Sequence, residues 1–295
     1  MRQITKDWGS AAGGERADAQ RKLPPMPELP EVETTRRGLA PHVVGQSISA
    51  VEVREPRLRW PVAKNLPRQL AEQRIDSLER RGKYLLFGTS AGTLLVHLGM
   101  SGSLRYLPQP QAHGTHDHID VRFADGGALR FNDPRRFGSF HLVAKPLEHP
   151  LLRELGPEPL GHDFDADYLW RSSQKRHVTI KQHLMNGKVV VGVGNIYASE
   201  ALFRAGIHPA RPAGRIARTR FEPLVTAVRE VLKDAIEEGG TTLRNFVGGD
   251  GQPGYFRGSL RVYERDGAAC VDCGTTIRRK VLGQRASYFC PRCQR

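Results

Sequence analysis

The chain has 295 residues, a length that fits roughly two domains of about 150 residues each. Apolar residues make up 39% of it and charged residues 26%, so the composition excludes a disordered polyelectrolyte and a small disulfide scaffold. No stretch reaches the roughly 18 to 20 uninterrupted apolar residues of a membrane-spanning helix. We therefore expect a folded protein with no membrane partner.

The charge balance is strongly basic. The chain carries 45 Lys and Arg against 31 Asp and Glu, a formal net charge of +14 and a pI near 10.0. Such an excess favours an anionic partner, and nucleic acid is a candidate because cationic side chains that neutralise phosphates release counterions. A basic pI is also common among soluble enzymes, so charge alone leaves the partner open.

The N-terminal part begins with a polar stretch and continues into a predicted helix. Residues 1–25 are rich in Gly and Ala and lack the apolar segment of a secretory signal, so we expect an unstructured tail. From Pro27 the sequence PELPEVETTRRGLAPHVVG places prolines first, acids in the next turn, and Arg36 and Arg37 after them. This order predicts a helix that ends before Gly38.

The region from Ser47 to Ala144 is predicted to be rich in strands. Short apolar segments separated by Gly, Asp, Asn and Pro indicate strands at 47–55, 83–89, 93–99, 118–125, 128–133 and 138–144. The connections between them are too short for the helices that join parallel strands. An antiparallel two-layer sandwich is therefore favoured over a doubly wound parallel sheet.

The region from about 157 to 245 is predicted to be mostly helical. Its clearest helix has apolar residues spaced three and four apart and ends at Gly239. These apolar positions are Phe221, Leu224, Val225, Val228, Val231, Leu232, Ala235 and Ile236. The Gly- and Asn-rich segment 243–256 that follows is expected to be a long flexible loop.

All four cysteines lie near the C-terminus in the pattern C-x2-C-x16-C-x2-C, at Cys270, Cys273, Cys290 and Cys293. Each CxxC turn can aim two sulfurs inward, and the residues between the pairs suit a hairpin that completes a tetrahedral thiolate cage. The alternative is two disulfides or redox pairs, which a reducing cytosol disfavours. We expect one zinc ion, structural because four thiolates close its coordination shell.

The segment around the cysteines is also basic. Residues 261–295 carry eight Lys and Arg against three Asp and Glu. One interpretation is a solvated surface hairpin. The other is a basic finger in which Arg285, close to the second cysteine pair, reaches a phosphate.

Taken together, several motifs resemble the bacterial formamidopyrimidine-DNA glycosylases, and the resemblance spans Pro27 to Arg295. The motifs are, in chain order, PELPEVET at 27–34, RRGKYLL at 80–86, HLGMSGSLR at 97–105, HDHID at 116–120, NDPRRFG at 132–138, LGPEPL at 155–160, VVGVGNIYASEALFRAGIHP at 190–209 and the cysteine ribbon. Their joint occurrence in this order is highly specific.

The resemblance implies an α+β protein of several domains that grips DNA in the cleft between them. Residues 27–150 would form an N-terminal antiparallel β-sandwich that carries the catalytic residues. Residues 157–255 would form a helical domain with a helix-two-turn-helix element, and 261–295 a zinc-ribbon hairpin. Residues 1–26 would be an extension that is absent from the active protein.

In this family the nucleophile is the secondary amine of an N-terminal proline, which Pro27 matches. The amine attacks the sugar, displaces the damaged base and forms an iminium that allows β,δ-elimination, so the family members are both glycosylases and lyases of abasic sites. Within the 295-residue chain the Pro27 nitrogen is a tertiary amide and cannot react. We expect Met26 to be the true initiator, removed to expose Pro27; a retained extension would abolish catalysis.

Three further residues carry catalytic roles by resemblance. Glu28 fits a general acid that protonates the sugar ring oxygen and later acts as a base, although an acid at a helix start is also favoured by the helix dipole. Lys83 would contact the target phosphate, although a lysine at a strand end needs no function. Arg285 would bind phosphate and donate a proton in the last elimination. For Glu31 and Glu33 the dipole explanation suffices, although Glu31 also matches the family motif.

DNA contacts are implied at eight positions. Extruding the damaged nucleotide leaves a hole in the stack, and Met100, Arg135 and Phe137 match the residues that fill it. Burial statistics alone would place Met100 and Phe137 in the core, and the motif context reverses that preference. The implied phosphate contacts, besides Arg135, are His97, His116, Arg176, Lys181 and Asn195. His116 and His118 could suggest a metal, but no third ligand lies near them in the sequence.

The function implied is removal of oxidised purines, 8-oxoguanine and formamidopyrimidines, from double-stranded DNA by a monomeric bacterial enzyme of the cytoplasm. Two alternatives stay open. The sister glycosylase for oxidised pyrimidines typically opens with PEGPE, whereas Leu29 in PELPE and the loop FVGGDGQPGYF favour the purine branch. A damage-binding protein without catalysis would tolerate an amide at Pro27.

Overall fold

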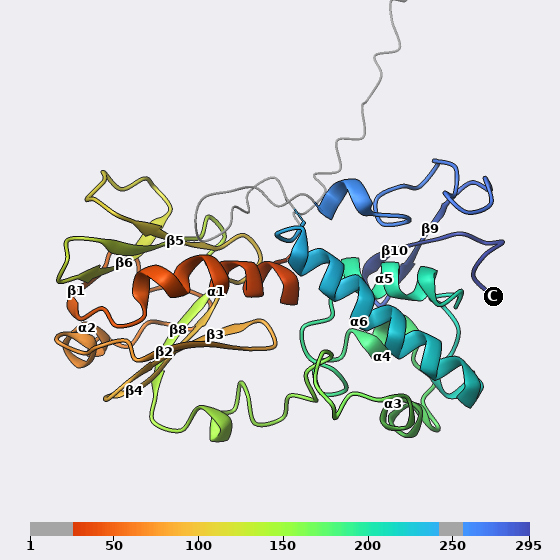
Figure 1. Cartoon of the computed structure of the whole chain (residues 1–295), viewed down its shortest axis with the longest axis horizontal. Helices are drawn as coiled ribbons and strands as arrows, with labels where there is room; N and C mark the ends of the chain where they lie inside the picture. Colours follow the sequence, from red (N-terminus) through yellow and green to blue (C-terminus); the bar gives the residue numbers. More distant parts are fainter. Residues whose placement is uncertain (1–25, 242–255) are drawn as a thin grey trace, which may run out of the picture.

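The computed structural model describes residues 26–241 and 256–295. The predicted tail at 1–25 and nearly all of the loop predicted at 243–256 lie outside the described residues. The described chain forms a sandwich of two sheets at one end and a helical half with a terminal hairpin at the other (Figure 1). The predicted fold class is confirmed.

The first helix, α1, spans Leu29–Val43 and contacts both the sandwich strands β2 and β5 and the helix α6. The predicted end before Gly38 is wrong. Leu39 and Val43 are fully buried and extend the apolar face, so tertiary packing stabilises the last turns despite the proline at position 41. Pro41 lacks the N–H that would bond the preceding turn, and the burial of Leu39 and Val43 offsets this loss.

Two four-stranded antiparallel sheets make the sandwich, in the orders β1-β6-β7-β5 and β2-β3-β4-β8. The strands are β1 Ile48–Val53, β2 Ser77–Arg81, β3 Tyr84–Thr89, β4 Gly92–His97, β5 Ser103–Leu107, β6 Asp117–Phe123, β7 Ala128–Asn132 and β8 Ser139–Val143. Between β1 and β2 lies the short helix α2, Leu66–Leu70. The sequence did not predict β2, β5 or α2.

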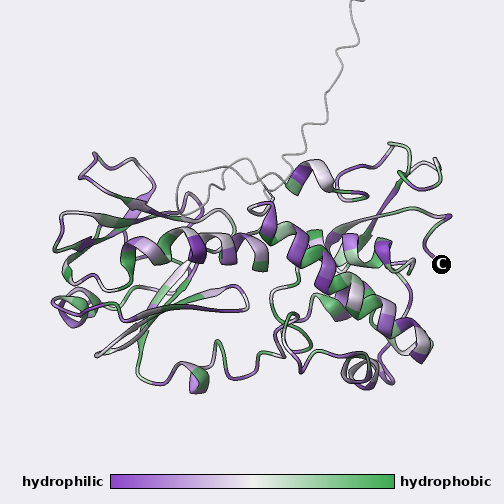
Figure 2. Cartoon of the chain, in the orientation of Figure 1, coloured by the Kyte–Doolittle hydropathy of each residue, from purple (hydrophilic) through white to green (hydrophobic). Residues whose placement is uncertain are grey.

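The helical half contains α3 Ala166–Ser173, α4 Ile180–Leu184, α5 Asn195–Arg204 and α6 Phe221–Glu237. Short 3-10 turns lie at Pro146–Glu148, Ala213–Arg215, Arg218–Arg220 and Phe256–Ser259. The helix α6 confirms the predicted amphipathic pattern, and Figure 2 shows apolar and polar residues alternating along it. It packs on α5, most of which is buried.

The C-terminal hairpin consists of β9, Arg278–Leu282, and β10, Arg285–Phe289. Its own apolar interior is small, and β10 packs against α5. Among the described residues, no helix is both long and apolar enough to cross a membrane.

Candidate functional site

The start of α1 is fixed against the start of α5 through the side chain of Glu28. This side chain is 2% exposed, and its carboxylate accepts hydrogen bonds from the backbone N–H of Gly194 at 2.8 Å and of Ile196 at 3.0 Å. These donors are among the N–H groups that a helix N-terminus leaves unpaired, and they favour negative charge. A Cβ atom at position 194 would overlap the Glu28 carboxyl group, so this approach requires glycine there.

Glu31 completes the arrangement one helical turn later. Its Oε2 accepts the backbone N–H of Glu28 at 2.9 Å, in a capping box, and its Oε1 accepts the Tyr197 hydroxyl at 2.6 Å and the Thr241 N–H at 2.9 Å. The side chain is completely buried. The dipole explanation from the sequence is therefore insufficient, because Glu31 joins α1, α5 and the end of the helical half around Pro27 and Glu28.

Cationic side chains face these carboxylates. Burial raises the pKa of Glu28, and the positive charge of Lys83 opposes that rise. Burial lowers the pKa of Lys83, an effect that Glu28 and Glu31 oppose and the charge of Arg285 reinforces. Lys83 enters from the turn between β2 and β3, and Arg285 from the start of β10. The fold thus gathers Glu28, Lys83 and Arg285 from three distant segments, beside Pro27.

Lys181 lies behind this cluster and is only 1% exposed. Its ammonium group donates to the Ala286 carbonyl at 3.0 Å and to the Ser287 hydroxyl at 2.8 Å, which joins α4 to the hairpin directly after Arg285. Burial lowers the pKa of Lys181 to about 7. In this arrangement the Lys181 side chain donates its hydrogen bonds to the hairpin. The phosphate contact remains a prediction.

A second part of the site is an open pocket of about 710 Å³ on the sandwich, lined by Arg57, Leu58, Arg59, Met100, Arg135, Arg136 and Phe137. It brings together the three residues that the resemblance assigned to filling the DNA stack. Phe137 is 38% exposed and Met100 is partly exposed, so neither is a core residue. The Arg135 guanidinium lies 4.8 Å from the centre of the Phe137 ring, and its buried Nη1 has no partner among the described residues.

Sequence reasoning missed the other arginines of this pocket. Arg57 and Arg59 come from the run REPRLRW, whose density of cations was an available signal. Glu55 accepts hydrogen bonds from Arg57 and Arg136, and these cations lower the pKa of Glu55 to about 2. Arg59 lies near enough to His97 to lower the pKa of that histidine.

The other residues predicted to contact DNA differ in their burial and their neighbours. His97 ends β4, and burial with the charges of Lys83 and Arg59 lowers its pKa to about 4. Asn195 begins α5, and its buried Oδ1 has no partner within the described ranges. His116 and Arg176 are exposed. The charge of Arg176 acts on His183, and within the described residues no hydrogen bond or ion pair joins Arg176 to the Glu28 cluster.

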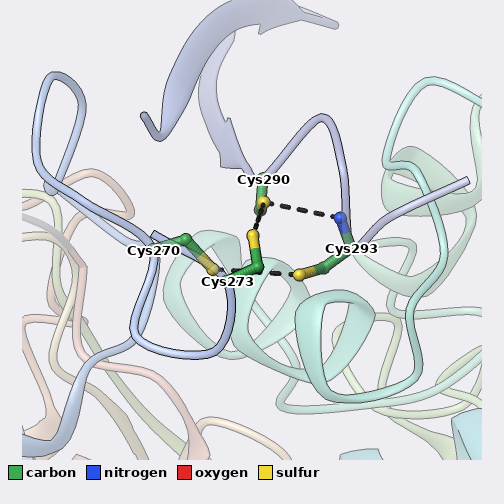
Figure 3. A group of neighbouring side chains, drawn as sticks. All are labelled: Cys270, Cys273, Cys290 and Cys293. Atoms are coloured by element: carbon green, nitrogen blue, oxygen red, sulfur yellow. Dashed lines mark hydrogen bonds between the residues drawn. The ribbon is translucent and has the colours of Figure 1, made fainter. Parts of the chain in front are cut away.

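The four cysteines converge as predicted (Figure 3). They form no disulfide, and their Sγ atoms all lie within 4.8 Å of one another. The Sγ atoms of Cys270 and Cys293 are 3.9 Å apart, and those of Cys273 and Cys290 are 3.5 Å apart. Ligands about 2.3 Å from a tetrahedral zinc ion would be separated by about 3.8 Å, so the cluster fits a structural metal. It is the one group of three or more possible ligands found among residues 26–241 and 256–295, and His116 and His118 are not part of it.

Comparison with known families decides the identity. Models of the formamidopyrimidine-DNA glycosylase N-terminal domain and of its H2TH domain match residues 26–140 and 155–247. A zinc finger found in these glycosylases and in IleRS matches residues 267–295. The chain belongs to the formamidopyrimidine-DNA glycosylase family. The resemblance inferred from the motifs is confirmed.

Individual relatives agree with this assignment. Proteins named formamidopyrimidine-DNA glycosylase from Stutzerimonas stutzeri and Alkalilimnicola ehrlichii are 58% and 56% identical over 92% of this chain and the whole of each relative. A Lactococcus lactis Fpg bound to DNA with an abasic site superposes with a TM-score of 0.84 at 34% identity, covering 91% of this chain and 99% of that one. MutM (Fpg) from Thermus thermophilus gives 0.81 at 41% identity, over 91% of this chain and 98% of its own.

Proposed function

We propose that this protein is a base-excision repair glycosylase that removes oxidised purines, 8-oxoguanine and formamidopyrimidines, from double-stranded DNA and then cleaves the abasic strand. Family membership supports the glycosylase activity, and a Lactococcus lactis relative, 35% identical, has been solved with DNA that contains a benzylated formamidopyrimidine. The observation that carries the proposal is the placement of Pro27 and Glu28 at the N-terminus of α5, opposite Lys83.

The proposed nucleophile is the secondary amine of Pro27 in a chain that begins at this residue. Its nitrogen forms a bond to C1′ of the damaged nucleotide, the bond from C1′ to the base breaks, and the base leaves with a proton. The bond from C1′ to the ring oxygen O4′ then breaks as O4′ takes up a proton, and nitrogen and C1′ share an iminium. The iminium draws electrons and acidifies the neighbouring sugar hydrogens. Successive β- and δ-eliminations break the two C–O bonds to the flanking phosphates.

Glu28 supplies the proton for opening the sugar and accepts one during elimination. Three backbone N–H groups favour its carboxylate form, whereas burial favours the neutral acid, and the net effect raises its pKa. A pKa nearer neutral suits both roles. Lys83 and Arg285 stabilise the phosphate beside the target, and Arg285 donates the last proton.

Damaged DNA would lie across the cluster and the arginine pocket. Met100 and Phe137 would fill the hole left by the extruded nucleotide, and Arg135 would bind the unpaired base on the other strand. Phosphates would be bound by His97, His116, Arg176, Lys181 and Asn195. The four cysteines would hold one structural zinc ion that keeps Arg285 in place, and the enzyme would act as a monomer on DNA in the cytoplasm.

An excision assay tests the proposal. The chain beginning at Pro27 is incubated with duplexes that contain 8-oxoguanine opposite cytosine, an oxidised pyrimidine, or no damage. We expect base release and strand cleavage to be fastest on the purine lesion. Preference for the pyrimidine lesion would identify the sister specificity, and tight binding without base release would identify a damage-binding protein; either result overturns the proposal.

A further inference from the structure

Asp133 lies where three loops of the sandwich meet. These are the turn after β4 with Met100, the segment before β6 with His116, and the turn after β7 with Arg135 and Phe137. The Asp133 side chain is 0% exposed. A buried carboxylate persists only where donors satisfy it, so its partners show what it holds in place.

The carboxylate binds two of these loops. Its Oδ1 accepts the Ser101 hydroxyl at 2.9 Å and the Arg135 N–H at 3.3 Å, and its Oδ2 accepts the Gly138 N–H at 2.8 Å. Ser101 directly follows Met100, and Gly138 directly follows Phe137. One side chain therefore binds the residue after Met100, Arg135 itself and the residue after Phe137, the three positions of the arginine pocket that are predicted to fill the DNA stack.

The Asp133 backbone adds the third loop. Its N–H donates to the His116 carbonyl at 3.0 Å, and its carbonyl accepts the Arg136 N–H at 3.1 Å. The buried His118 ring is 2.8 Å from that same carbonyl. Arg136 has a φ of +56°, a strained conformation for this residue type, and the bond to the Asp133 carbonyl helps hold it.

The two turns also touch directly. A Cβ atom on Gly99 would lie 2.5 Å from the Phe137 carbonyl carbon and the Gly138 nitrogen. The two turns can therefore come this close only because residue 99 has no side chain, and the carboxylate of Asp133 joins them.

We infer that Asp133 is the positioning residue of the DNA-reading pocket: it holds Met100, Arg135 and Phe137 as one rigid wedge. This rests on the proposed function and adds a residue that touches neither DNA nor the reacting atoms. A wedge is effective only if its side chains enter the stack together, because a displacement of about 1 Å in a positioned group can cost roughly 100-fold.

Binding to duplexes that contain a tetrahydrofuran abasic analogue tests the inference with the zinc-loaded full chain. Asp133→Asn has the same shape but turns an NH2 group toward hydrogen-bond donors. We expect the preference for cytosine over adenine opposite the analogue to fall roughly tenfold, the worth of one bidentate base contact. Affinity for the single-stranded abasic oligonucleotide should stay within about twofold, because no opposite strand or hole is present.

The matched control is Asp120→Asn, which breaks the ion pairs of another buried carboxylate, with Arg130 in the same sheet and with Arg54. It should lower the melting temperature and leave the preference intact. Ser101→Ala removes one hydrogen bond to Asp133 and should reduce the preference roughly threefold. This milder variant decides the question if Asp133→Asn does not fold.

An unchanged preference in Asp133→Asn, or in Ser101→Ala where the first variant is unfolded, overturns the inference. So does an equal loss on single-stranded and duplex DNA, because that result indicates general destabilisation. A wild-type chain with no preference for damaged duplex removes the proposed function and the inference together. If the wild-type chain prefers cytosine over adenine opposite the analogue and the variants keep that preference, the inference alone is removed.

Discussion

The carboxylate cluster and the arginine pocket are built in opposite ways. Glu28 is 2% exposed and its carboxylate is held by backbone N–H groups of α5, whereas Phe137 is 38% exposed and Arg57 is mostly in solvent. The first region is closed to solvent by the protein itself, whereas the second is an open surface that DNA could cover. We therefore expect substitutions in the cluster to lower the rate of base excision, and substitutions in the pocket to change which DNA duplexes are bound.

The largest effect is expected at Glu28. Glu28→Gln keeps the size of the side chain but cannot supply the proton, so base excision should fall by roughly 100- to 10,000-fold while DNA affinity is retained. Single-turnover excision and a binding assay measure the two quantities. Glu33→Gln, an acid of the same helix that pairs with Arg36 instead, is the control and should excise normally. Equal loss of binding and excision in Glu28→Gln would contradict the division between the regions.

The hairpin supplies Arg285 to the carboxylate cluster, so removing the structural metal should disturb that cluster. Cys290→Ser should lose zinc and weaken DNA binding by roughly tenfold or more, the worth of a charged hydrogen bond, while the other domains stay folded on their own cores. Elemental analysis and a binding assay measure this. The control Val271→Ser changes an exposed residue between two cysteines and should keep its zinc. A metal-free protein with full affinity would refute the prediction.

In the pocket, Arg135→Ala should reduce the preference for cytosine opposite the lesion by roughly tenfold. The neighbouring variant Arg136→Ala removes a cation of the same pocket and should weaken binding to all duplexes alike. Competition between duplexes that differ only in the opposite base measures the preference. If Arg135→Ala and Arg136→Ala lower affinity equally for every opposite base, the pocket contributes only positive charge to DNA binding.

The last prediction concerns the stability of the fold rather than DNA binding, and its site is Lys181, between the cluster and the hairpin. Burial lowers its pKa to about 7, so between about pH 7 and 10 the unfolded chain, with an ordinary lysine pKa near 10.4, binds a proton that the folded chain does not. The free energy of unfolding should therefore rise with pH in this window, by at most about 1.4 kcal/mol per pH unit. Lys181→Met should lack this rise in denaturant unfolding at several pH values. If the free energy of unfolding changes with pH in the same way in both proteins, the lowered pKa of Lys181 does not contribute to stability.

Much of the fold followed from local patterns. The sandwich strands that alternate or cluster apolar residues were predicted, but β2 reads SLERR, with one apolar residue, and β5 reads SLRYL, whose apolar residues do not alternate strictly. In the fold, β2 pairs with its neighbour β3 in a hairpin, and β5 pairs with β7, beyond β6 in the sequence. The end of α1 was misplaced because burial of Leu39 and Val43 outweighs the local signal of Gly38.

The site was predictable only where motifs carry it. Pro27, Glu28 and the cysteines stand in recognisable patterns, whereas the bond from Tyr197 to Glu31 joins residues that no local rule relates. The same holds for Asp133, whose importance comes from loops that meet only in the folded protein. Sequence spacing also could not show that Lys181 is buried against the hairpin.

Borohydride trapping tests most directly the central claim that the Pro27 amine is the nucleophile. The chain that begins at Pro27 and the full 295-residue chain are each incubated with a duplex containing 8-oxoguanine and treated with borohydride, which reduces an iminium to a stable crosslink. Intact mass confirms where each chain begins. We predict a protein–DNA crosslink for the chain that begins at Pro27 and none for the full chain. Equal crosslinking by both would contradict the account, and a lysine such as Lys83 would then have to be the nucleophile.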